Sequence, residues 1–125
     1  LRGGIVEDCV ISEGCIIDGG IIKDSILGVR SRVFKDVNIT DTIMMGTDHY
    51  ETSEMANSKE PRYGIGERTV IKQAIIDKNA RIGNDVRLVN QNNLQEYKDP
   101  EDRFLVRDGI IVVPKKAIIP HGFSF

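Results

Sequence analysis

The sequence predicts an all-β fold, a parallel β-helix of hexapeptide repeats with about five coils and two loop excursions. Aliphatic residues recur at every sixth position, and turn-forming Gly, Asp, Asn and Ser separate them. A short strand cannot bury its apolar face alone, so it must stack on the next coil. The ladders with this spacing are Ile5-Ile11-Ile17, Val10-Ile16-Ile22, Ile21-Leu27-Val33-Ile39-Met45, Val70-Ile76-Ile82-Leu88 and Ala74-Ala80-Val86.

The first block of repeats covers residues 5–46. Three flat faces per coil predict about eighteen residues in each coil and a rise of about 4.8 Å, the ordinary spacing of neighbouring strands. Residues 47–63 break the period with a polar stretch that contains Pro61. We expect an excursion there, with a short helical turn around residues 54–58, because an insertion can leave a solenoid at a corner at little cost.

The repeat resumes over residues 64–89, where "IGERTV" and "IGNDVR" give its clearest form. The polar residues 90–103 are expected to form a second loop. Strand character returns over residues 104–123 and allows one more coil. Pro114 and Pro120 in that segment belong at corners or on an edge, because proline cannot donate to an inner ladder.

The composition fits one β-helix domain over residues 1–125. The net charge is -2 and no dense basic run is present, which disfavours a nucleic-acid or membrane partner. No apolar stretch is long enough to span a bilayer, and no secretory signal is visible, so we expect a soluble intracellular domain. Cys9 and Cys15 are expected to be small core residues on adjacent faces of one coil rather than a disulfide. The chain starts at Leu1 without an initiator methionine, which suggests a fragment whose first coil is capped by a preceding segment.

Few residues suggest catalysis. The two histidines are His49 and His121, and His49 in the excursion could serve as the general base of a hexapeptide acyltransferase. Two separated histidines do not make a zinc site, so no metal is expected. We expect a solvated loop at the acidic residues Asp99, Glu101 and Asp102.

Cationic residues near the corners suggest an anion site. Lys78 and Arg81 lie in "IIDKNARIG", and Lys115 and Lys116 follow the last long strand. If they converge, they could bind a phosphorylated metabolite through charge-assisted hydrogen bonds. Arg30 and Arg32, in "LGVRSRV", are further cations beside a turn.

Several strings resemble one family over nearly the whole chain. "LGVRSRV", "DTIMMGTDHYET", "GIGERTVIKQAIIDKNARIGNDVRLVN" and "VRDGIIVVPKKAIIP" look like the C-terminal domain of glucose-1-phosphate adenylyltransferase. The resemblance implies a left-handed β-helix. It also implies a parent enzyme whose N-terminal domain joins glucose 1-phosphate to ATP with Mg²⁺, giving ADP-glucose and pyrophosphate for glycogen or starch synthesis. This chain has no such nucleotide-binding loop, so we expect it to be inactive alone and to need no cofactor of its own.

The resemblance further implies a regulatory and assembly role within a tetramer of like or mixed subunits. Lys78 and Lys115 match effector-binding lysines of plant and cyanobacterial relatives, where 3-phosphoglycerate or another glycolytic intermediate activates and inorganic phosphate inhibits. Arg81 and Lys116 complete the expected anion site. The location would be the cytoplasm in a bacterium and the plastid stroma in a plant or alga. Two alternatives stay open, a hexapeptide acyltransferase that uses His49 and the β-helix of another sugar nucleotidyltransferase.

Overall fold

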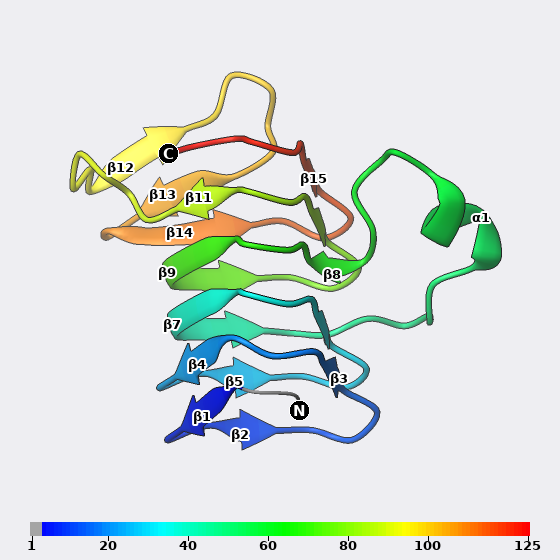
Figure 1. Cartoon of the computed structure of the whole chain (residues 1–125). Helices are drawn as coiled ribbons and strands as arrows, with labels where there is room; N and C mark the ends of the chain where they lie inside the picture. The colour runs from blue at the N-terminus through cyan, green and yellow to red at the C-terminus, as the bar shows by residue number, and fades with distance from the viewer. Residues whose placement is uncertain (1–3) are drawn as a thin grey trace.

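The computed structural model describes residues 4–125 as a parallel β-helix of five stacked coils with three faces (Figure 1). The expected domain start at residue 1 lies outside the described residues. The first face contains β1 (Ile5–Glu7), β4 (Ile21–Lys23), the first halves of β7 (Asn38–Met44) and β9 (Val70–Ile76), and β11 (Arg87–Leu88). The second contains β2 (Val10–Ile11), β5 (Ile26–Leu27), the second halves of β7 and β9, and β14 (Ile110–Val113). The third contains β3 (Ile16–Ile17), β6 (Arg32–Val33), β8 (Gly64–Ile65), β10 (Arg81–Ile82) and β15 (Ile118–Ile119).

The coils are shorter than the expected eighteen residues. Ile5 pairs with Ile21, so the first coil advances by 16 residues, and Ile22 pairs with Ile39, so the second advances by 17. In each of the first four coils the corner between the first and second faces takes five residues rather than six, as from Ile22 to Leu27, and a residue with positive φ lies at that turn. These left-handed residues are Asp8, Asp24, Asp41 and Gln73.

The tight corner shifts the inward register by one residue, which corrects part of the predicted ladders. Met44 is 4% exposed whereas Met45 is 45% exposed. Successive side chains on a strand point to opposite faces, so a one-residue slip moves a side chain from the interior to the surface. For the same reason the predicted ladder residues Ile5, Val10, Ile16, Ile21 and Val70 lie on outward positions, next to the inward residues of their strands.

Between tight corners the six-residue spacing holds, as predicted. The confirmed inward ladders are Leu27-Val33-Ile39, Ile76-Ile82-Leu88 and Ala74-Ala80-Val86. Each buried branched side chain contributes about 1.5–3 kcal/mol relative to exposure, so the stacked ladders hold the prism together. Cys9 and Cys15 are free thiols, partly buried against this core, in agreement with their expected packing role.

The two ends of the prism differ. At the N-terminal end the inward Ile11 is 41% exposed, because no coil in the described residues covers it. At the C-terminal end Phe104 is 2% exposed and packs against the rings of Tyr97, Phe123 and Phe125. The C-terminal end of the core is therefore closed by aromatic side chains.

An antiparallel hairpin carries part of that closure and corrects the expected loop over residues 90–103. β12 (Glu96–Lys98) pairs with β13 (Leu105–Arg107), which continues antiparallel to β14. Asp99 between these strands is only 2% exposed, so it is not a solvated loop residue. Its two carboxylate oxygens accept hydrogen bonds from Arg103 Nε at 2.7 Å and Nη2 at 3.1 Å. The acidic cluster thus contains one buried, paired carboxylate.

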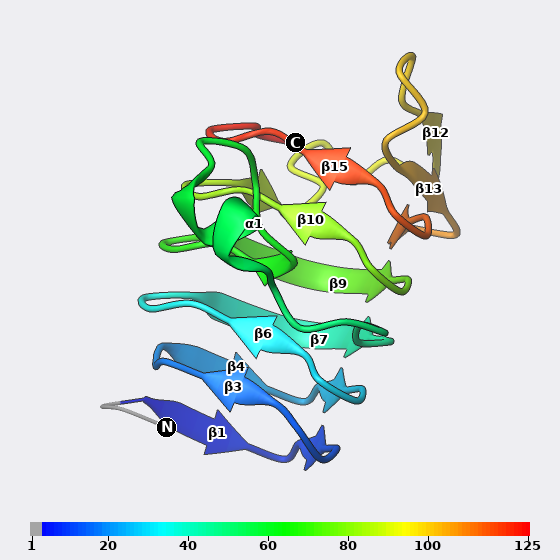
Figure 2. The same ribbon diagram turned by 90° about the vertical axis from the view of Figure 1, so that its right-hand side faces the viewer.

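The predicted excursion leaves the prism at the corner after β7 and carries the short helix α1 (Ser53–Asn57). Figure 2 shows α1 standing over the third face, beside β6 and β10. The Thr52 hydroxyl caps α1 by accepting a hydrogen bond from the Met55 N–H. No helix in residues 4–125 combines the length and apolar character needed to cross a bilayer.

Candidate anion-binding site

Three stacked turns form one corner of the prism, between the second and third faces. The Asn79 N–H donates to the Gly46 carbonyl at 3.1 Å, and the Lys116 N–H donates to the Lys78 carbonyl at 3.0 Å. These bonds place the turn after β14 on the turn after β9, and that turn on the start of the excursion. This stacking brings three lysines from two separate segments of the chain, Lys78, Lys115 and Lys116, to a single corner.

A carboxylate at this corner was not anticipated. Asp48 accepts a hydrogen bond from Lys78 Nζ at 3.2 Å and another from Asn79 Nδ2 at 3.1 Å. Hydrogen bonds from Asn79 and Lys78, together with the charges of Lys78 and Lys115, hold the pKa of the Asp48 carboxyl below its ordinary value. Asp48 is therefore charged at neutral pH and faces the predicted lysines.

A cavity of about 310 Å³ opens beside this corner. Its lining includes Arg81 and Lys116 from the prism and His49 and Tyr63 from the two ends of the excursion. Arg81 is oriented by a hydrogen bond from its Nε to the Pro61 carbonyl at 2.7 Å, which also ties the excursion to β10. The cavity thus has one wall from the coils and one from the excursion.

The corner carries unbalanced positive charge. Lys115 and Lys116 are exposed, and neither they nor Arg81 form an ion pair with a carboxylate in residues 4–125. Lys78 is 48% exposed in its side chain, so its ammonium can contact a ligand from solvent. Such ammonium and guanidinium groups bind phosphate oxygens through charge-assisted hydrogen bonds.

The other cations of the sequence analysis have structural partners. Arg32 pairs with Asp18 at 2.8 Å and lies 3.9 Å from the centroid of the Phe34 ring. Arg30 donates from Nε to the Thr47 carbonyl at 3.0 Å, which fixes the chain just before Asp48. They stabilise the turn and the third face.

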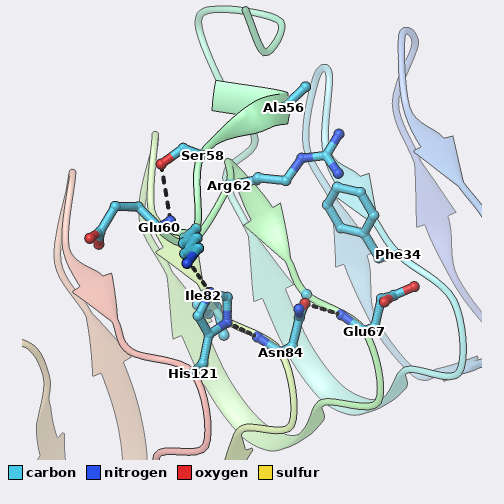
Figure 3. Close-up of a pocket in the computed structure, with 11 residues that line it drawn as sticks. Phe34, Ala56, Ser58, Glu60, Arg62, Glu67, Ile82, Asn84 and His121 are labelled. Atoms are coloured by element: carbon cyan, nitrogen blue, oxygen red, sulfur yellow. Dashed lines mark hydrogen bonds between the residues drawn. The ribbon is translucent and has the colours of Figure 1, made fainter. Parts of the chain in front are cut away.

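A second hollow, of about 370 Å³, lies between the excursion and the third face (Figure 3). Arg62 lies over the Phe34 ring there, and Glu67 faces the same space. The backbone N–H of Asn84 donates to His121 Nδ1 at 2.8 Å, so the proton of the neutral ring lies on Nε2, which donates to the Lys59 carbonyl at 2.8 Å. His121 therefore has a structural role in holding the excursion.

The five stacked three-sided coils define a hexapeptide-repeat β-helix domain. The family model described as the GLGC left-handed parallel β-helix domain matches residues 1–123, and the chain belongs to that family. This match confirms both the left-handed fold and the resemblance to glucose-1-phosphate adenylyltransferase. The chain is also 37% identical, over 123 residues, to an Arabidopsis thaliana protein named inactive glucose-1-phosphate adenylyltransferase small subunit 2, chloroplastic. The matched region is 94% of this chain and 26% of that relative.

Proposed function

We propose that this β-helix is the regulatory and assembly domain of a glucose-1-phosphate adenylyltransferase subunit. Its family membership supports the choice of enzyme. The single observation that carries the regulatory role is the stacking of Lys78, Lys115 and Lys116 at one corner, beside the cavity lined by Arg81. We assign to this corner the binding of phosphate or of a small phosphorylated effector.

Chemistry and geometry support an anion ligand. Lysine is a compact point charge that suits phosphate, whereas the planar guanidinium of arginine can hold two phosphate oxygens at once. The cavity places one such guanidinium and one lysine beside the exposed His49 and the half-buried Tyr63. An effector that binds one global state of the enzyme better than another shifts the population with a coupling of about 1–3 kcal/mol.

We assign the transfer chemistry to another part of the parent protein. No group of three His, Cys, Asp or Glu side chains in residues 4–125 is placed to hold a metal ion. In the proposed parent protein, ATP and Mg²⁺ would bind to an N-terminal catalytic domain, with which this β-helix would pack. The parent would reside in the plastid stroma in a plant or alga, as the chloroplastic relative suggests, and in the cytoplasm in a bacterium.

An outward apolar stripe supports the assembly role. Val10, Ile26 and Ile43 occupy equivalent outward positions on the second face and are 62%, 44% and 40% exposed. Adjacent exposed aliphatic residues on a sheet face are typical of a surface that packs against protein. We propose that this stripe contacts the catalytic domain or a neighbouring subunit of a tetramer.

The anion site can be tested on the chain itself. Inorganic phosphate is titrated into the wild type and into Lys78→Ala and Lys115→Ala, with binding followed by calorimetry and amide chemical shifts at low salt. We expect each substitution to weaken binding about five- to tenfold, since a charge contact at close range is lost. Lys98→Ala, which removes an exposed lysine from β12, is the matched control. Equal phosphate affinity in all four proteins would remove the corner from consideration as an anion site.

The acyltransferase alternative depends on His49, which lines the same cavity. It predicts acetyl transfer from acetyl-coenzyme A by the chain alone, and loss of that transfer in His49→Ala. The adenylyltransferase proposal predicts no acetyl transfer by either protein.

A further inference from the structure

We propose that Asp48 is an internal competitor of the anionic ligand, which occupies Lys78 in the free domain and thereby sets the affinity of the corner. This inference rests on the proposed function of the lysine corner. The Asp48 carboxylate already accepts hydrogen bonds from two donors of the corner, with one oxygen on Lys78 Nζ and the other on Asn79 Nδ2. A ligand that uses Lys78 must share it with Asp48 or displace Asp48.

Asp48 and Asn79 exchange two hydrogen bonds, one through the Asp48 backbone and one through its side chain, and these hold the Asp48 carboxylate at the corner. The Asp48 N–H donates to Asn79 Oδ1 at 2.8 Å, while the Asn79 amide donates back to the Asp48 carboxylate. Asn79 is itself 5% exposed and fixed in a left-handed turn with φ of 62°. The amide of Asn79 therefore holds both the backbone and the side chain of Asp48.

The residue before Asp48 is anchored as well. Thr47 is 5% exposed, its N–H donates to the Val29 carbonyl at 3.0 Å, and its own carbonyl accepts from Arg30 Nε at 3.0 Å. These contacts fix the chain at the point where the excursion leaves the prism. The Asp48 carboxylate is thus presented from a rigid position, unlike a charge at the tip of a mobile surface chain.

Asp48 is also the single carboxylate, within residues 4–125, that forms an ion pair with any of the four proposed anion contacts. Lys115, Lys116 and Arg81 can receive a ligand without displacing an acidic partner. Two carboxylate or phosphate anions held against one ammonium repel each other, so the negative charge of Asp48 opposes ligand binding. Removing that charge while preserving the side-chain shape should strengthen binding.

The test compares inorganic phosphate binding by the wild type, Asp48→Asn and Asp48→Ser at about 0.01 M ionic strength, where charges interact over about 30 Å. We expect Asp48→Asn to bind phosphate about fivefold more tightly than the wild type, since one charge at about 4 Å is neutralised. Asp48→Ser, which also removes the carboxylate, should shift affinity in the same direction. Asp102→Asn makes the same change in net charge, on an exposed ion pair away from the corner. It should change phosphate affinity by no more than about twofold, a small remaining effect that reflects incomplete screening at this ionic strength. Thermal melts establish that each variant is folded.

The outcomes separate this inference from the proposed function. If the wild type binds phosphate through Lys78 and both Asp48 variants bind with unchanged or weaker affinity, the competitor role is wrong while the anion site stands. An equal gain in Asp102→Asn would likewise overturn it, because net charge alone would then explain the effect. If neither the wild type nor the variants bind phosphate, both the site and the competitor role fail.

Discussion

The imidazole Nε2 of His121 lies 2.8 Å from the carbonyl oxygen of Lys59, 62 positions earlier in the chain. His121 follows β15 in the last coil, whereas Lys59 follows α1 in the excursion. The opposite ring nitrogen accepts the Asn84 N–H, so a neutral imidazole bridges the coil and the excursion. The excursion is thereby fastened to the third face at a point far from where it leaves the prism.

His121→Ala should loosen the excursion without unfolding the coils. One hydrogen bond contributes about 0.5–1.5 kcal/mol, so local opening of the excursion should become about two- to tenfold more frequent. Limited proteolysis within residues 48–62 would measure this as faster cleavage. His49→Ala is the matched control, because His49 forms no side-chain hydrogen bond in the described residues. Equal cleavage rates in the wild type and His121→Ala would contradict the fastening role.

We expect Asp99 to make the free energy of unfolding decrease at acidic pH. Hydrogen bonds from the Arg103 side chain hold the pKa of the Asp99 carboxyl below its ordinary value of 3.8 in the folded state. Between the folded and unfolded pKa values the unfolded chain binds more protons, so the stabilisation is complete above about pH 4 and disappears as pH falls through the folded pKa. Asp99→Asn should lower the free energy of unfolding by about 1–3 kcal/mol at pH 7.

The same substitution should flatten the pH profile below pH 4, because its side chain no longer titrates. Denaturant unfolding between pH 3 and pH 7 would measure both effects. Asp102→Asn provides the comparison, since Asp102 is 74% exposed in its side chain and its pair with Lys98 should contribute under about 1 kcal/mol. If the free energy of unfolding depends on pH in the same way in the wild type and in Asp99→Asn, Asp99 is not the source of the acid sensitivity.

The hexapeptide period was enough to predict the prism, its five coils and most of its interior. It could not reveal the tight corner, because Asp24 and Asp41 are ordinary turn residues, and residues with positive φ, such as Arg30 and Asp36, also lie at the corners that keep six residues. The hairpin strand β12 was also missed. Glu96 and Lys98 are exposed, so this strand is held by backbone pairing and has no inward apolar pattern to read.

The lysine corner was anticipated from charge near predicted turns, and stacking brought Lys78 and Lys116 together. Asp48 was not anticipated, because the turn on which it stacks depends on how the excursion departs from the coil. Asn79 follows Lys78 in a predicted turn, where an asparagine is an ordinary residue. Only its buried, left-handed position shows that it orients Asp48.

Because of the one-residue shift in register, Ile26 points outward and Leu27 points inward on the second face. The two residues are therefore a matched pair for testing the outer and inner sides of that face. Leu27 is fully buried, so Leu27→Ala should destabilise the chain by about 2–5 kcal/mol. Ile26 is 44% exposed, and Ile26→Ala should cost less than about 1 kcal/mol in the isolated chain. Denaturant unfolding measures both, and equal costs would contradict the assigned register. In the assembled parent protein, Ile26→Lys should weaken association, as measured by sedimentation.

Gln73 occupies the tight corner at the position held by Asp24 and Asp41 in preceding coils, with φ of 54°. A left-handed conformation costs an ordinary side chain about 1–2 kcal/mol, whereas asparagine and aspartate adopt it more readily because their short side chains bond to the local backbone. Gln73→Asn should therefore raise the free energy of unfolding by about 0.5–1 kcal/mol. Lys72→Asn, one residue earlier in β9 and also exposed, should give no gain, since asparagine is disfavoured in strands. Denaturant midpoints at constant slope would distinguish the two substitutions, and a gain from Lys72→Asn equal to that from Gln73→Asn would show that corner strain is not the cause.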